Sequence, residues 1–248
     1  MPRMLALAAA LALLPAALGA QTLSQRVQAA GDGTVRLSFA SRPGVCGTGT
    51  SITIDDDGDD DWESDCERGP VRVSLRRMGG RITGAESRVG GRWREGRADV
   101  TDLGLVSARE AAALMLELAP RAGEDGGALI TAATLADSAV VWPGLLRLAR
   151  DDALAMETRR QAVFWLSQAS GDAATRGLDS LVVDDHGDLE VREHAVFALS
   201  QRPADEGVPA LIRVARGSPH PELRRRALFW LGQSEDPRAI ELFEELLR

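Results

Sequence analysis

One nine-residue phrase, RRALFWLGQ, occurs in three versions in the second half of the chain and constrains the fold more than any other feature. Its versions occupy residues 159–168, 192–201 and 225–233. An alanine holds the same place in each, at Ala162, Ala195 and Ala227. These alanines lie 33 and 32 residues apart, and each period has room for two helices. A fixed period of this length indicates stacked helix pairs, so we expect residues 106–248 to form an all-α α-solenoid.

The register of the repeats predicts which side chains are buried. Each first helix should carry apolar residues three positions apart on one face, at Leu145 and Leu148, Leu178 and Leu181, and Leu211 and Val214. Each second helix is apolar almost all round, which is typical of a helix packed between layers. The recurring aromatic residues are therefore expected in the core and not at a ligand site: Phe164, Phe197, Phe229, Trp165 and Trp230.

Aspartates and prolines mark the expected helix starts. An acidic side chain there accepts hydrogen bonds from free amides and interacts favourably with the helix dipole. Proline is tolerated in the first turn because its missing N–H has no partner at that position. The residues concerned are Asp172, Asp205, Asp236, Pro209 and Pro237.

Two stretches, DLEVREHAVFALSQ (188–201) and HPELRRRALFWLGQSEDPRAIELFEELL (220–247), resemble short HEAT repeats of the kind found in exported bacterial proteins. The resemblance is clear over residues 140–248 and weak over residues 107–140. It implies a scaffold that binds another protein through a concave surface lined by the second helices.

The resemblance also implies a ladder of Asp–Arg contacts between successive repeats. An aspartate should stand four residues before the repeated arginine, and Asp188 does so before Arg192. The equivalent positions hold Ala155 and His220. Only one rung of such a ladder is therefore complete in this chain.

The polar positions of the second helices are the candidate protein-binding residues. These positions are Arg160, Gln161, Glu193, His194, Arg225 and Arg226. A glutamine follows near the end of each helix, at Gln168, Gln201 and Gln233. The alternative for all of them is a solvated helix surface that ends in capping side chains.

The first twenty residues, MPRMLALAAALALLPAALGA, match a secretory signal peptide, with one early arginine, an apolar run and small residues at the end. The alternative is a membrane anchor, but the run is short and Pro15 interrupts it. We expect cleavage near Ala20 and export, most simply to a bacterial periplasm, with an extracellular location as the alternative. No integral membrane segment would then remain.

Residues 21–105 are expected to form a small β-rich domain. Alternating apolar residues predict strands at 34–40, 51–54 and 71–77, and a short helix should precede them near 23–30. Glycine-rich stretches at 78–84 and 89–93 suggest hairpins. Cys46 and Cys66 are the only cysteines, and in an exported protein they should form a disulfide. The expected fold class is therefore α+β multidomain: a disulfide-stapled β-rich domain followed by a HEAT-like α-solenoid.

An acidic loop at residues 55–67 holds nine carboxylates and no cation. Hard cations such as calcium take several oxygen ligands from such loops, and the candidate ligands are Asp55, Asp57, Asp59 and Asp61. The spacing fits no EF-hand loop. Residues 68–97 carry nine arginines, so the two segments could instead neutralise each other as screened surface charge. A third possibility is that the arginines hold an anionic ligand.

Composition and motif content narrow the function. A net charge of −8 argues against nucleic-acid binding, which depends on neutralising phosphates. The chain has three histidines, and none stands in a Ser-His-Asp, Cys-His or repeated His-Glu arrangement of the kind used by di-iron HEAT enzymes. We therefore expect no catalytic residues and no cofactor.

The function that these observations favour is a non-enzymatic, exported scaffold that binds a protein of the cell envelope. One alternative is an envelope protein that senses a cation or small ligand through the acidic loop 55–67. Another is an uncharacterised enzyme built on HEAT-like repeats.

Overall fold

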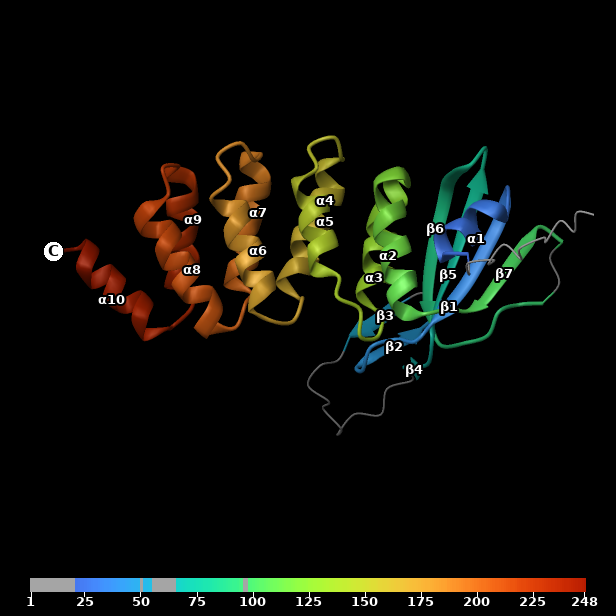
Figure 1. The fold of residues 1–248 in the computed structure, drawn as a ribbon. Coiled ribbons are helices and arrows are strands. Elements are labelled where there is room, and N and C mark those ends of the chain that lie inside the picture. The colour runs from blue at the N-terminus through green and yellow to red at the C-terminus, as the bar shows by residue number, and fades with distance from the viewer. Residues whose placement is uncertain (1–20, 50, 55–65, 96–97) are drawn as a thin grey trace, which may run out of the picture.

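The computed structural model describes residues 21–49, 51–54, 66–95 and 98–248. A β-rich region at the N-terminal side is followed by helices that stand side by side in a row (Figure 1). The expected signal peptide at residues 1–20 lies outside the described residues. So do Asp55, Asp57, Asp59 and Asp61, the candidate cation ligands.

In its described residues, the β-rich region contains one helix and two sheets. The strand orders are β6-β5-β1-β7 in the four-stranded sheet and β3-β2-β4 in the three-stranded sheet. β1 is antiparallel to β5 and parallel to β7. The elements are α1 (Leu23–Ala29), β1 (Gly33–Phe39), β2 (Val45–Thr48), β3 (Ser51–Ile54), β4 (Glu67–Arg68), β5 (Val71–Met78), β6 (Arg81–Val89) and β7 (Val100–Leu105).

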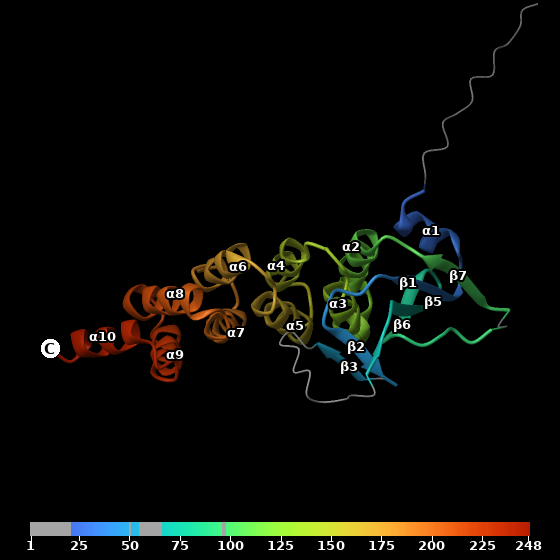
Figure 2. The ribbon, with the colours of Figure 1, turned by 90° about the horizontal axis from the view of Figure 1, so that it is seen from below.

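One face of the four-stranded sheet is buried. The alternating residues Val35, Leu37 and Phe39 of β1 stand opposite Leu75, Val73 and Val71 of β5, and all six are buried. Helix α1 and the first helices of the row lie beside this sheet (Figure 2) and share its apolar core. The period-two pattern therefore identified β1 and β5 and their buried faces correctly.

The hairpin expected at residues 78–84 is confirmed, and the one at 89–93 is wrong. Gly79 and Gly80 turn β5 into β6 with positive φ angles, and their amides donate hydrogen bonds to Asp32 at 2.8 and 3.2 Å. These bonds lower the pKa of the Asp32 carboxyl. After Val89, by contrast, the chain crosses over to β7, which runs parallel to β1.

The disulfide is confirmed. Cys46 of β2 and Cys66 are bonded, with their Cα atoms 5.3 Å apart. The bridge closes a loop between positions separated by 20 residues. On the chain-entropy account, a loop of this length stabilises the folded state by about 3 kcal/mol.

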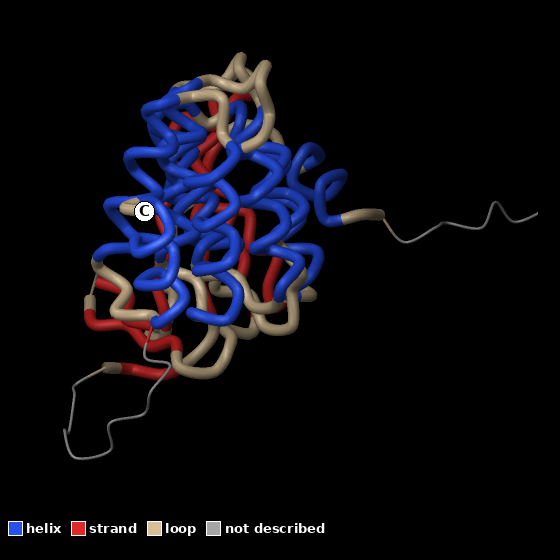
Figure 3. Tube along the Cα trace, turned by 90° about the vertical axis from the view of Figure 1, so that its left-hand side faces the viewer, coloured by secondary structure: helices blue, strands red, loops and turns tan. Residues whose placement is uncertain are grey.

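The helices from residue 108 onward pack as pairs. First helices α2, α4, α6 and α8 form one row, and second helices α3, α5, α7 and α9 form the other (Figure 2). Seen along the row from the C-terminal side, the loops gather at the two ends of the helices (Figure 3). The bounds are α2 (Ala108–Leu118), η1 (Ala119–Arg121), η2 (Gly123–Asp125), α3 (Gly126–Thr134), α4 (Trp142–Arg150), α5 (Met156–Ser167), α6 (Asp172–Val182), α7 (Leu189–Ser200), α8 (Ala204–Gly217), α9 (Pro221–Gly232) and α10 (Pro237–Leu246).

The helix pairs bury the residues that the register predicted. Ala162, Ala195 and Ala227 are fully buried, and successive second helices contact one another. The paired apolar residues of the first helices are also buried: Leu145, Leu148, Leu178, Leu181, Leu211 and Val214. One hydrophobic cluster runs from Leu23 of α1 to Leu242 of α10, so the β-rich region and the helices share a continuous core.

The placement of the three phenylalanines in the core is wrong. Phe164, Phe197 and Phe229 are 47%, 36% and 57% exposed. Trp165 is buried and Trp230 is partly buried, as expected. Helices α5, α7 and α9 are not enclosed on all sides: each keeps one outward face, and its phenylalanine lies on that face.

One of the expected helix starts, at Pro209, is wrong, and the others are confirmed. Asp236 caps α10, whose first residue is Pro237, and Asp172 and Asp205 lie in the first turns of α6 and α8. Pro209, however, lies inside α8, because this helix already begins at Ala204.

The middle helix pair gives a direct test of the shared core. Leu199 of α7 is fully buried, and Leu199→Ala should lower the free energy of unfolding by about 2–5 kcal/mol through lost burial and a cavity. Because neighbouring pairs share their interfaces, the whole urea transition should shift. Leu189→Ala, at an exposed position of the same helix, is the control and should shift the midpoint little. An unchanged midpoint for Leu199→Ala would contradict this packing.

The cap of α10 should respond to acid. Hydrogen bonds from the Arg238 guanidinium lower the pKa of Asp236 from 3.8 to about 2. Because the pKa is lower in the folded state, the ionised cap stabilises α10 above pH 4 and this contribution is lost as the pH falls toward 2. Asp236→Asn keeps a capping side chain but does not titrate, so its α10 should show no such acid dependence in amide exchange. Equal acid dependence in both proteins would contradict this assignment.

Candidate functional site

Helices α5, α7 and α9 contact one another in succession, and their outward side chains are named here the second-helix face. The three helices contribute the same kinds of residue at equivalent positions. The acidic positions are Glu157, Glu190 and Glu222; the aromatic positions are Phe164, Phe197 and Phe229; the carboxamide positions are Gln168, Gln201 and Gln233. All six candidate binding residues predicted from the sequence also belong to this face.

The phenylalanines of this face are held by tryptophans. Trp230 lies between Phe197 of α7 and Phe229 of α9, with ring centroids 5.1 and 5.0 Å away. Phe164 packs edge-on against Trp165 at 5.3 Å. Aromatic pairs at these distances are favourable beyond their burial. The phenylalanines are therefore exposed but fixed in position.

Ion pairs join neighbouring helices across the face. Arg160 Nη1 of α5 donates to Glu190 of α7 at 3.0 Å, and Arg226 Nη2 of α9 donates to Glu193 of α7 at 2.8 Å. Within single helices Arg160 also bonds Glu157, and Arg225 bonds Glu222. Ion pairs as exposed as these are screened by water and add little to stability. They position the polar side chains around the phenylalanines more than they stabilise the fold.

The remaining candidates, His194 and Gln161, are partly buried. Burial lowers the pKa of His194, and the charge of Arg160 lowers it further. His194 is therefore neutral at pH 7. Gln161 lies beside Gly127 of α3, where a β-carbon would contact its side chain at 3.8 Å.

A hollow lies beside this face between α3 and α5. Its volume is about 630 Å³, and small side chains of α3 form one wall: Gly127, Ala128 and Thr131. These residues precede Arg160, Gln161 and Phe164 by 33 positions each. The hollow exists because α3 has small residues where the later second helices have bulky ones.

Buried arginines set the register beneath the face. Arg159 Nε donates to the Ala149 carbonyl at 3.2 Å, and Arg192 Nε donates to the Val182 carbonyl at 2.9 Å. Each arginine thus ties a second helix to the end of its first helix. The expected Asp188 rung exists, but as a contact to Arg159 of the preceding pair, at 3.4 Å.

At the next rung a histidine takes the place of the aspartate. Arg192 Nη1 lies 3.0 Å from His220 Nε2, and Arg192 Nη2 donates to Asp185 at 3.2 Å. His220 immediately precedes α9, as Asp188 precedes α7. The same connection between pairs is therefore made with different side chains.

Arg202 was not singled out by the sequence, yet it connects two helix pairs. Its side chain is buried, and Nε donates to Thr175 Oγ1 at 2.8 Å while Nη2 donates to Glu206 at 3.0 Å. The hydrogen bond from Thr175 lowers the pKa of Glu206, and Arg202 lowers it further. The Arg202 guanidinium also donates to the carbonyls of Ser167, Ala169 and Gly171, at 2.9, 2.5 and 3.0 Å. Register comparison could not reveal this residue, because the preceding pair has Ala169 at the equivalent position.

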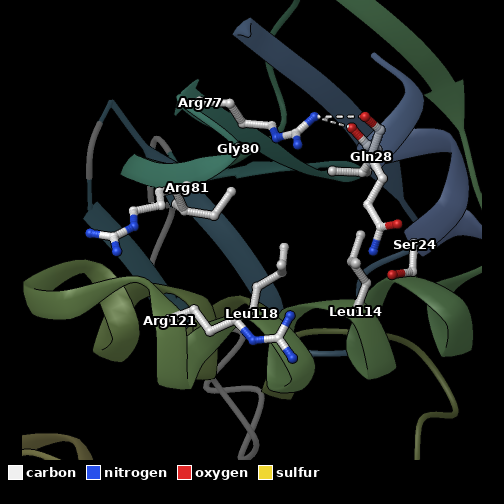
Figure 4. A pocket seen from close by; sticks show the side chains of 10 residues that line it. Ser24, Gln28, Arg77, Gly80, Arg81, Leu114, Leu118 and Arg121 are labelled. Atoms are coloured by element: carbon white, nitrogen blue, oxygen red, sulfur yellow. Dashed lines mark hydrogen bonds between the residues drawn. The ribbon is translucent and has the colours of Figure 1, made fainter. Parts of the chain in front are cut away.

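A second hollow of about 380 Å³ lies between α1, the β5–β6 hairpin and α2 (Figure 4). Arg77 reaches across it, and its Nη1 donates to the carbonyls of Val27, Gln28 and Gly31 at the end of α1. Ser24 donates to Glu117 of α2 at 3.3 Å. These polar groups connect α1 to the sheet and to α2. We therefore interpret this hollow as a boundary between packed elements and not as a ligand site.

Two negative observations apply to the described residues. No group of three or more His, Cys, Asp or Glu side chains there could hold a metal ion. No helix in this part of the chain is both long and apolar enough to span a membrane.

The family comparison agrees with the geometry of the helix pairs. A family model of HEAT repeats matches residues 178–248, from α6 to the C-terminal side of α10. These residues are HEAT repeats, as the resemblance in the sequence indicated. A comparison of the chain with curated proteins finds no match.

The buried Arg202 should matter far more than an exposed arginine of the same region. Arg202→Met should lower the free energy of unfolding by about 2–4 kcal/mol, because three carbonyls and Glu206 lose a buried donor. Arg213→Met, which removes an exposed pair with Asp179, should change it by about 0–1 kcal/mol. Urea titrations of both variants measure the difference. Similar midpoints would contradict a connecting role for Arg202.

Proposed function

We propose that this protein is an exported, non-enzymatic scaffold whose HEAT-like α-solenoid binds a protein partner of the bacterial cell envelope through the second-helix face. One observation carries the proposal: three phenylalanines are exposed at equivalent positions of successive helices. Large apolar side chains gathered on a surface and surrounded by polar residues mark sites of protein association.

The arrangement of the face suits a protein partner. Because Trp230 and Trp165 hold the phenylalanine rings, little side-chain entropy remains to be lost on binding. The surrounding Arg–Glu pairs are mutually satisfied, so an apolar partner surface can cover the centre while these pairs stay in contact with water. Buried aromatic anchors with a polar rim are the usual source of binding energy at protein interfaces.

Export and the absence of catalysis are parts of the same proposal. The composition of residues 1–20 supports export, and the bonded Cys46–Cys66 pair suits an oxidising compartment. The scattered histidines support a binding role over a catalytic one. Turnover of a defined substrate by the purified protein would contradict the proposal that it is not an enzyme.

The face can be tested by crosslinking tagged mature protein in its own host, followed by mass spectrometry. A triple variant, Phe164→Ala, Phe197→Ala and Phe229→Ala, should lose the envelope protein that the wild type captures, because the central apolar contacts are gone. It should remain folded, since these side chains are partly in solvent already.

The matched control removes equally apolar side chains elsewhere. Leu105, Met78 and Val183 are all more exposed than the phenylalanines and lie on none of the three second helices. Their triple alanine variant should capture the partner as the wild type does. Loss of capture in both variants, or in neither, would contradict the second-helix face as the binding surface.

A further inference from the structure

We propose that a cavity between the β-rich region and the helices, named here the junction pocket, binds a small organic carboxylate with an apolar body. Its volume is about 370 Å³, and ligand pockets typically range from about 300 to 1,000 Å³. The β1–β2 turn, the end of α3, the approach to α4 and the end of α5 supply its walls.

An arginine that pairs with no carboxylate of the described residues lies in this pocket. Arg42 is partly buried, and its side chain donates no hydrogen bond to any residue in the described ranges. Its Nε atom is buried without a partner. Among the described residues, those that line the pocket include no aspartate or glutamate. The Nε–H group of Arg42 is withdrawn from water without an acceptor, which is costly, and a carboxylate bound by the guanidinium would supply both the charge and the acceptor.

A second unpartnered donor belongs to the same pocket. Trp165 is buried, and its indole Nε1 has no hydrogen-bond partner. Within the described part of the chain, Arg42 Nε and Trp165 Nε1 are the buried side-chain atoms left without partners, and both residues line the junction pocket. Folded proteins give nearly all buried polar groups a partner. Two unmatched donors in one cavity therefore indicate a missing acceptor.

The other residues that line the pocket indicate which kind of molecule would carry the carboxylate. The indoles of Trp142 and Trp165 and the side chains of Val140 and Val141 form apolar walls. Gln168 and the hydroxyls of Thr134, Ser138 and Ser170 add polar contacts around them. The single formal charge among these residues is that of Arg42, so the pocket favours an anion over a neutral or cationic molecule of the same shape.

The test uses ¹⁵N-labelled full-length mature protein and follows the indole N–H resonance of Trp165, assigned with Trp165→Phe. Phenylacetate and indole-3-acetate are the carboxylate probes. Acetate lacks the apolar body, benzyl alcohol lacks the charge, and benzylamine reverses it. We expect saturable shifts of the Trp165 resonance with the two carboxylate probes and at least tenfold weaker binding of the other three.

Two variants distinguish binding in the junction pocket from a general attraction of carboxylates to positive charge. Arg42→Gln should weaken phenylacetate binding at least tenfold and leave the melting temperature nearly unchanged, because this side chain has no hydrogen bond to a described residue that could be lost. Arg68→Gln removes an exposed arginine of β4 outside the pocket and should bind like the wild type. The proposal is overturned if neither carboxylate moves the Trp165 resonance, if benzyl alcohol binds as well, or if Arg42→Gln chiefly destabilises the fold.

Discussion

The buried contact between successive second helices is the constraint on which the rest of the structure depends. A single helix pair cannot bury its own apolar face, so each pair needs the next, and the small residues Ala162, Ala195 and Ala227 let α5, α7 and α9 approach closely. Arg159 and Arg192 fix the register of α5 and α7 on their first helices. Equal register then places equivalent outward residues in a row. The second-helix face is thus a consequence of how the core repeats.

The β-rich region closes the N-terminal side of this core. Its four-stranded sheet places a buried apolar face beside α1, α2 and α3, and one hydrophobic cluster continues from the sheet through the helix pairs. An isolated backbone bridge between Ser41 and Ala136 joins the two regions directly. Terminal pairs of stacked helices need such a cover to keep their apolar faces from water. The junction pocket lies where this cover meets the helices, and Gln168 of the second-helix face also lines it.

Local patterns in the sequence predicted the helix pairs, the strands β1, β3 and β5, and the disulfide, because periodicity and cysteine pairing are short-range signals. The exposed phenylalanines were predicted wrongly because the prediction relied on how many residues of each second helix are apolar and not on where they lie around the helix. Phe164 lies three and four positions after Gln161 and Arg160, and therefore on the same side of α5 as these polar residues. The pairing of β7 with β1 and the contacts of Arg202 depend on segments far apart in the chain. The junction pocket likewise joins Arg42 with Trp142 and Trp165, which no spacing rule connects.

The most direct measurement of the central claim is site-specific photocrosslinking in the host, with p-benzoylphenylalanine introduced at residue 197 or at residue 183. Both positions are exposed, but only Phe197 lies on the second-helix face. The account predicts a crosslink to one envelope protein from residue 197 and none to that protein from residue 183. The same crosslinking pattern from both positions, or a discrete partner from residue 183 alone, would contradict it.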